Sequence, residues 1–279
     1  MSGKLYLCAT PIGNLEDITF RVLRTLKEAD LIAAEDTRHS LQLLNHFEIK
    51  KPMTSYHEYN KYEKAETLIG MLKEGKQIAL ITDAGTPGIS DPGEVLVRRC
   101  IEEQIEVTSI PGPAAVVTAL TMSGLSTRRF AFEAFLPADK KERKQILEEL
   151  KSETRTIVLY EAPHRLKKTL GELLENLGET RKIAVVKELT KKHETVRWFT
   201  LGEAVAYYEE NEPRGEYVIV LEGRDRKEIE QEKAAFWKAM TVEEHVAYYE
   251  AQGNDRKSSM KLAAADRGVS RRDIYQQLL

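Results

Sequence analysis

Short apolar runs alternate with longer amphipathic stretches over the first 125 residues. The runs predict strands at residues 4–10, 31–34, 77–82 and 107–110, and a 3.6-residue period predicts helices at residues 18–28 and 58–74. Four successive apolar residues at 78–81 are typical of a strand that is buried on both faces. The pattern therefore predicts a parallel β-sheet covered by helices.

The alternation starts again after residue 124. Strands are predicted at residues 130–135, 156–160, 183–187, 196–200 and 217–221, and helices at 140–151, 165–177 and 202–211. Several of these strands follow one another closely, which favours a mixed sheet over a parallel one.

Residues 226–279 show helical patterns only, with breaks at residues 252–254 and 267–270. Ser270 is a predicted cap for a last helix that ends at Leu279. We therefore expect an α/β domain at 1–124, a second α/β domain at 125–225 and a small helical appendage at 226–279 that resembles a helix-turn-helix.

Composition narrows the class of protein. The hydrophobic fraction of 42% and the charged fraction of 31% are those of an ordinary globular protein. Cys8 and Cys100 are far apart and have no His or Cys at metal-ligand spacing, so neither a disulfide framework nor a metal site is expected. The sequence also lacks an apolar run of membrane-spanning length and a signal peptide, which predicts a cytoplasmic protein.

Charge is distributed unevenly along the chain, although its net value is only −3. Residues 164–197 carry nine basic and five acidic residues, and residues 254–279 carry six basic and three acidic ones. Such local basic surface permits contact with a polyanion. The alternative is that these segments form ordinary solvent-exposed faces with no binding role.

Four loops rich in glycine and proline follow predicted strands, at residues 10–14, 83–91, 111–115 and 161–165. Ligands of wound α/β sheets bind beyond the carboxyl ends of the strands, so these loops are expected to line one cleft. The Rossmann glycine pattern, the P-loop, the nucleophile elbow and the zinc-peptidase motif are all missing, which disfavours NAD, ATP, α/β-hydrolase and zinc-peptidase chemistry. The near-neutral 83–90 loop suits a nucleoside that bears an amino acid better than a polyphosphate.

Six ordered motifs carry a resemblance to a known family: ATPIGNL at 9–15, AEDTR at 34–38, DAGTPG at 83–88, IPGP at 110–113, YEAPHR at 160–165 and KELTK at 187–191. Together they resemble the tetrapyrrole (corrin and porphyrin) methylases, and more closely the branch that methylates the ribose 2′-hydroxyl of a cytidine in 16S ribosomal RNA.

The resemblance implies a class III S-adenosylmethionine methyltransferase fold, with two α/β domains and the cofactor cleft between them, usually as a homodimer. Its implied substrate is a cytidine of the decoding region in the assembled small ribosomal subunit, and no metal is implied. The cofactor contacts that it implies are Pro11, Asp83, Ala84, Gly85, Ile89, Ala114, Ala115, Tyr160, Leu189 and Thr190.

A base or hydrogen-bond acceptor near the ribose hydroxyl would assist methyl transfer. We select Glu188 and His164, because each follows a predicted strand of the second domain. The structural alternatives are a helix cap for His164 and an ion pair with Lys187, Lys191 or Arg165 for Glu188.

Further residues are candidates for contact with RNA. Arg38 and Arg165 suit phosphate, Asp36 would orient Arg38, and His57 lies in an aromatic segment that could stack on a base or pack in the core. In the appendage the candidates are Lys257, Lys261, Arg271 and Arg272, unless this segment is a packing or dimerisation hairpin.

Two other functions remain open at this point. A methylase of a corrin or porphyrin precursor would share the cofactor loops, and a non-catalytic ribosome-binding factor would share the fold. The basic segments favour RNA over a tetrapyrrole, and the complete set of cleft motifs favours an enzyme.

Overall fold

The computed structural model describes residues 2–279, apart from the side chain of Lys233. Two compact units are present. The first contains both β-sheets and runs to Leu147, then resumes at Thr156–Glu222; the second combines Glu148–Arg155 with Gly223–Leu279. The division into three domains at residues 124 and 225 stays a prediction.

The first sheet is entirely parallel, as its buried strands predict. Its strands are β1 (Lys4–Cys8), β2 (Leu31–Ala34), β3 (Met53–Ser55), β4 (Ile78–Ile81) and β5 (Glu106–Ile110), in the order β3-β2-β4-β1-β5. The order reverses between β4 and β1, so the loops that follow these two strands diverge there.

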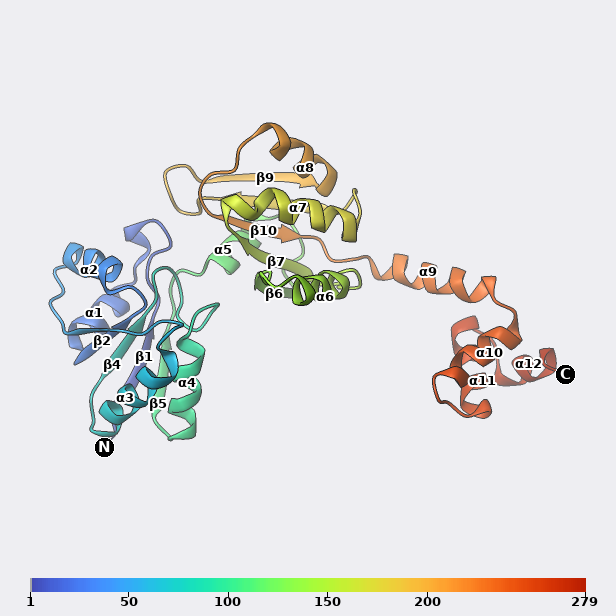
Figure 1. The fold of residues 1–279 in the computed structure, drawn as a ribbon, viewed down its shortest axis with the longest axis horizontal. Coiled ribbons are helices and arrows are strands. Elements are labelled where there is room, and N and C mark those ends of the chain that lie inside the picture. The colour runs from blue at the N-terminus through green and yellow to red at the C-terminus, as the bar shows by residue number, and fades with distance from the viewer. Residues whose placement is uncertain (1) are drawn as a thin grey trace. The chain divides into compact units, whose positions relative to one another are not determined.

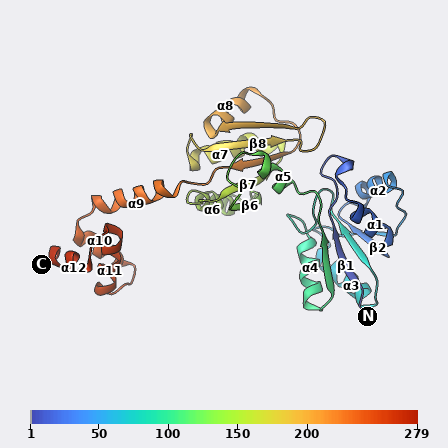
Figure 2. The ribbon, with the colours of Figure 1, turned by 180° about the vertical axis from the view of Figure 1, so that it is seen from behind.

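Helices cover both faces of this sheet (Figures 1 and 2). They are α1 (Phe20–Glu28), α2 (Thr37–His46), α3 (Lys61–Lys73) and α4 (Gly93–Glu102), after a short 3-10 turn at Leu15–Asp17. One apolar core joins α1 and α2 to β1, β2 and β4, and a second joins α3 and α4 to the opposite face of these strands.

The second sheet is mixed, as predicted. Its strands are β6 (Phe130–Phe135), β7 (Thr156–Glu161), β8 (Lys182–Lys187), β9 (Thr195–Thr200) and β10 (Tyr217–Leu221), in the order β6-β7-β10-β8-β9. Only β6 and β7 pair in parallel.

Four helices accompany the second sheet. They are α5 (Ala115–Met122), α6 (Lys140–Leu150), α7 (Pro163–Leu177) and α8 (Leu201–Glu210). Helix α5 shares an apolar core with β7, β8 and β10, while α7 packs on α8 and α8 packs on β8 and β9.

The appendage consists of α9 (Arg226–Ala239), α10 (Val242–Ala251), α11 (Arg256–Arg267) and α12 (Arg271–Gln277). Gly268 ends α11 in the left-handed conformation, with φ of 64°, and the Ser270 hydroxyl accepts a hydrogen bond from Asp273 N at the start of α12. The predicted breaks and cap are thus confirmed, although the last helix ends at Gln277 rather than at Leu279. A small core around Val246, Ala263 and Ile274 holds α10, α11 and α12 together.

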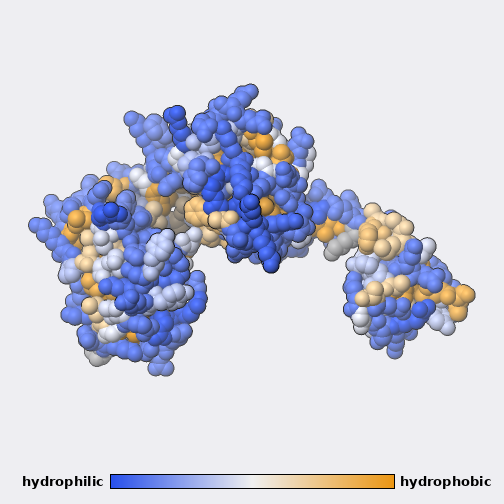
Figure 3. Space-filling view, viewed as in Figure 1, coloured by the Kyte–Doolittle hydropathy of each residue, from blue (hydrophilic) through white to orange (hydrophobic). Residues whose placement is uncertain are grey.

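Several elements differ from the predictions. Strand β3 and helices α2, α4 and α5 are not among the predicted elements, and α3 begins at Lys61 rather than at residue 58. Helix α5 has only two polar side chains, Thr118 and Thr121, so it lacks the charged face that marks an amphipathic helix. In the chain from residue 2 onward, no helix combines the length and apolar character needed to cross a membrane. The visible face is mostly hydrophilic (Figure 3).

Candidate active site

The loops after β1 and β4 are joined by a short antiparallel bridge. Thr10 N donates to Gly85 O at 2.9 Å, and Gly85 N donates to Thr10 O at 3.1 Å. The buried Thr10 hydroxyl also donates to Thr82 O at 3.1 Å. Gly85 has φ of 85°, a left-handed conformation that costs a residue with a side chain free energy, and a Cβ there would come within 3.3 Å of Ile12.

Asp91 holds the 83–91 loop in shape. Its carboxylate accepts hydrogen bonds from Gly88 N at 2.8 Å, Ile89 N at 3.2 Å and Gly93 N at 2.7 Å. Burial raises the pKa of this carboxyl group, and the three N–H donors oppose that rise. The loop is also tied to the segment after β5, since the Thr86 hydroxyl donates to Pro113 O at 2.9 Å.

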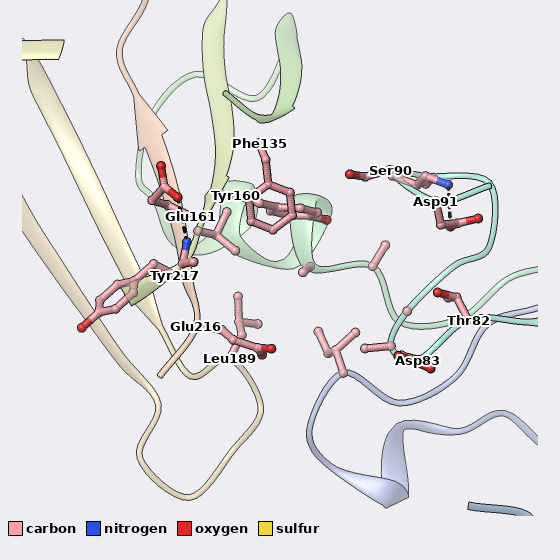
Figure 4. A pocket seen from close by; sticks show the side chains of 18 of the residues that line it. Thr82, Asp83, Ser90, Asp91, Phe135, Tyr160, Glu161, Leu189, Glu216 and Tyr217 are labelled. Carbon is pink, nitrogen blue, oxygen red and sulfur yellow. Dashed lines mark hydrogen bonds between the residues drawn. The ribbon is translucent and has the colours of Figure 1, made fainter. Parts of the chain in front are cut away.

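A pocket of about 600 Å³ opens beside these loops (Figure 4). From the first-sheet segment it is lined by Ile12, Glu35, Thr82, Asp83, Ala84, Gly85, Thr86, Ile89, Ser90, Asp91, Ala114 and Ala115. From the second-sheet segment it is lined by Phe135, Tyr160, Glu161, Ala162, Pro163, His164, Val186, Leu189, Glu216, Tyr217 and Val218. The volume is that of a site for a small organic ligand.

Left-handed backbone is concentrated around this pocket. Six non-glycine residues of the described chain have positive φ, and four of them line it or adjoin a lining residue: Ser90 (63°), Ala134 (51°), Glu188 (51°) and Thr190 (64°). Such conformations persist only where the surrounding structure enforces them, and they gather at functional sites. Glu188 and Thr190 flank Leu189, which lines the pocket.

The pocket brings together most of the residues predicted to contact the cofactor. Asp83, Ala84, Gly85, Ile89, Ala114, Ala115, Tyr160 and Leu189 all line it. Pro11 and Thr190 do not; Thr190 packs instead against Gly13, where a Cβ would lie 2.8 Å from its Oγ1. The Tyr160 hydroxyl accepts a hydrogen bond from Val116 N at 3.1 Å, which ties β7 to the start of α5.

The two candidate bases are placed differently. His164 lines the pocket in the first turn of α7, and it does not cap this helix, because the capping position belongs to Ala162. Glu188 is not a lining residue; its carboxylate accepts hydrogen bonds from Glu216 N at 2.9 Å and Lys191 Nζ at 3.0 Å. These contacts lower the pKa of Glu188, which makes it a weak base. Glu188 thus forms the ion pair with Lys191 that was its structural alternative.

The residues predicted to contact RNA lie outside the pocket lining. Asp36 caps α2 and forms an ion pair with Arg38 at 2.8 Å, as expected, and the Arg38 side chain is 89% exposed. Arg165 donates to Leu136 O and lies 3.4 Å from Glu161, while His57 Nε2 is 3.4 Å from Asn60 Nδ2. The appendage candidates Lys257, Lys261, Arg271 and Arg272 are all exposed.

Several lining residues are absent from the predicted set. Glu35 and Glu161 belong to the AEDTR and YEAPHR motifs. Glu216 precedes β10, and Tyr217 and Val218 begin it, but no motif marks these three residues as part of a site. Strand β10 runs antiparallel between β7 and β8, which brings Tyr217 opposite Glu161 and Lys187 at the carboxyl ends of both. This pairing depends on sheet topology and is not encoded locally.

The pocket lining is acidic. Its carboxylates are Glu35, Asp83, Asp91, Glu161 and Glu216, and no Lys or Arg of the described chain belongs to the lining. Two of these carboxylates pair with cations outside the lining, since Glu161 lies 3.4 Å from Arg165 and Glu216 lies 2.9 Å from Lys191. Partial burial raises the pKa of Asp83, and the nearby charge of Glu35 adds to this effect. Glu35 and Asp83 therefore make the first-sheet side of the pocket favourable to a positively charged group.

Comparison with known proteins identifies the family and the fold of this chain. Residues 4–205 match the family model described as Tetrapyrrole (Corrin/Porphyrin) Methylases. Solved structures with the same fold include a diphthine synthase (TM-score 0.61, 16% identity, covering 79% of this chain and 90% of that one). They also include a cobalt precorrin-4 methyltransferase (TM-score 0.58, 20% identity, covering 78% of this chain and 94% of that one).

Fold and pocket thus define a methylase of the class III type, and the predicted fold class is confirmed. Curated relatives named ribosomal RNA small subunit methyltransferase I are 51% identical in Halalkalibacterium halodurans, 46% in Bacillus subtilis and 42% in Escherichia coli. The alignments cover 98%, 98% and 99% of this chain and 93%, 93% and 95% of the relatives. The chain belongs to the tetrapyrrole methylase family and, within it, to the group of these ribosomal RNA methyltransferases.

We predict that Asp91→Asn loosens the 83–91 loop. An amide has one acceptor oxygen instead of two, so the N–H of Ile89 or of Gly93 loses its partner, at a cost of about 1–2 kcal/mol. Hydrogen exchange followed by mass spectrometry should show roughly tenfold faster exchange at these amides. Unchanged protection of the loop would show that Asp91 does not hold it.

Proposed function

We propose that this chain transfers the methyl group of S-adenosylmethionine to the ribose 2′-hydroxyl of a cytidine in the decoding region of 16S ribosomal RNA, in the assembled small subunit. The names of the curated relatives give the class of reaction and the ribosomal substrate. The observation that carries the proposal is the 42–51% identity to these relatives over 98–99% of the chain, because it separates this activity from the methylation of a corrin or porphyrin precursor.

S-adenosylmethionine fits the residues that are present. The Asp83–Gly85 loop, Ala114 and Ala115 offer small side chains and backbone, which allow a nucleoside to approach closely. The carboxylates of Glu35 and Asp83 suit the cationic sulfonium and ammonium groups, and Leu189 with Val218 supplies apolar surface. When bound, the cofactor supplies an activated methyl group.

The comparisons disfavour the alternative substrate, a corrin or porphyrin precursor. The solved cobalt precorrin-4 methyltransferase is 20% identical to this chain, whereas the ribosomal RNA methyltransferase of Halalkalibacterium halodurans is 51% identical. An RNA strand can keep its phosphates outside the pocket and insert a single ribose.

Within the pocket, His164 is the proposed acceptor of the 2′-hydroxyl proton. His164 lines the cavity, and a neutral imidazole nitrogen would accept the hydroxyl proton as the carbon–oxygen bond forms and the carbon–sulfur bond breaks. The second-sheet segment otherwise orients the acceptor, since methyl transfer is an in-line displacement that depends on alignment.

Outside the pocket, we assign the phosphate contacts to Arg38 and to the basic residues of the appendage. The exposed Lys257, Lys261, Arg271 and Arg272 lie on α11 and α12, on either side of the Gly268 turn. We also propose that the protein is a homodimer, which analytical ultracentrifugation would test. We propose a cytoplasmic location, which cell fractionation would test.

The decisive test is transfer of tritiated methyl to small subunits that lack the modification, beside free 16S RNA and a tetrapyrrole precursor. We expect label in the subunit RNA and resistance to alkaline cleavage at one position, because a 2′-O-methyl ribose cannot support that cleavage. Label in the tetrapyrrole alone would overturn the proposed substrate, and no label anywhere would support a non-catalytic ribosome-binding protein.

We predict that Gly85→Trp abolishes S-adenosylmethionine binding and leaves the protein folded. The new ring would enter the pocket beside Ile12, and the left-handed backbone adds about 1–2 kcal/mol of strain. Gly88→Trp is the matched control, because Gly88 has φ of 87°, open space around it and no place in the lining. Retained binding by Gly85→Trp in calorimetry would refute this cofactor site.

We also predict a separable role for the appendage. Replacing Lys257, Lys261, Arg271 and Arg272 by Gln should raise KM for the subunit and flatten its dependence on salt, by roughly 0.7 in the logarithmic slope for each phosphate that is no longer neutralised. The affinity for S-adenosylmethionine should not change. The control replaces four exposed lysines elsewhere: Lys27, Lys76, Lys140 and Lys141. Equal effects of both sets would contradict a specific role of the four appendage side chains in binding RNA.

A further inference from the structure

Strand β6 contains an irregularity that changes which side chains share a face. Its register with β7 pairs Phe132 with Val158 and Ala134 with Leu159, so Glu133 is an extra residue in a β-bulge. Ala134, the next residue, has φ of 51°. In a regular strand Phe132 and Phe135 would point to opposite faces, because they are three residues apart.

The bulge places both rings on one face. Phe135 pairs with Tyr160, and its ring lies 5.6 Å from that of Tyr160; the Phe132 ring lies 4.9 Å from the same ring on the same face. Phe132 belongs to the apolar core, whereas Phe135 lines the pocket and is 48% exposed. A left-handed alanine and a bulge thus present an aromatic ring to a solvent-accessible cavity.

The ring lies apart from the proposed cofactor contacts of the 83–85 loop, although it neighbours Tyr160. Figure 4 shows Phe135 beside Tyr160 and well apart from Asp83. Phe135 also lies near the end of β6, next to the end of β7, and the chain leads from β7 through Ala162 to His164 in the first turn of α7. The exposed ring and the proposed proton acceptor therefore belong to the same wall of the pocket.

We infer that Phe135 is a stacking platform for the base of the target nucleotide. The inference rests on the proposed function, since a ribose that enters the pocket requires its base to leave the stack of the RNA. Unstacked bases are held on aromatic side chains, which tolerate any base and recover part of the lost stacking. Stacking on Phe135 would hold the nucleoside while the 2′-hydroxyl reaches His164.

The test compares Phe135→Leu with Phe135→Tyr in the full-length protein. Leucine keeps an apolar side chain but removes the planar face, so kcat/KM for small subunits should fall roughly tenfold, while tyrosine should stay within about threefold of the parent. Phe132→Leu is the matched control, because it removes the other ring on Tyr160 from outside the pocket, and it should change kcat/KM less than twofold. Calorimetry should give the same Kd for S-adenosylmethionine in all four proteins.

Each other outcome would overturn the inference in its own way. A parallel loss of S-adenosylmethionine affinity in Phe135→Leu would assign the ring to the cofactor. Equal losses in Phe132→Leu and Phe135→Leu would assign it to packing, which thermal unfolding of both variants would reveal. An unchanged kcat/KM in Phe135→Leu would show that the ring does not hold the base. If the parent protein labelled no RNA, the proposed function itself would be wrong.

Discussion

The pocket depends on the bridge between the backbones of Thr10 and Gly85. Strands β1 and β4 are adjacent, but their connections lead in opposite directions, and two backbone hydrogen bonds hold their following loops together at that divergence. A side chain at Gly85 would crowd Ile12, so glycine keeps the backbone open to a ligand. Asp91 then fixes the rest of the loop, and the remaining wall comes from the ends of β7, β8 and β10.

The proposed reaction requires the protein to bind a cationic methyl donor and a polyanionic RNA, and side chains of opposite charge serve these two purposes. Glu35 and Asp83 line the pocket, which suits a cationic methyl donor, while the exposed basic side chains of Arg38, α11 and α12 lie outside the lining. A polyanionic substrate can therefore be held by its phosphates on the outside and contribute only one nucleoside to the inside. The net charge of −3 conceals this arrangement.

The sequence predicts the parallel and mixed sheets, because buried strands and their turn residues leave a local pattern. It also identifies the loops of the pocket, and eight of the ten predicted cofactor contacts line it. It does not predict the lining residues of β10, whose position depends on pairing between distant strands. Nor does it indicate that Phe135 faces the pocket, since the bulge at Glu133 breaks the alternation on which such a prediction rests. Glu188 shows a third limit, because a carboxylate after a strand can turn to a neighbouring lysine and backbone N–H instead of the cavity.

A crystal structure of the protein with S-adenosylhomocysteine tests the central claim most directly, because it locates the donor relative to both walls. The account predicts that the ligand lies against Asp83–Gly85, Ala114 and Ala115, with its sulfur facing the wall that carries His164, and that Phe135 remains uncovered. A ligand bound outside this pocket, or an adenine stacked on Phe135, would contradict the account.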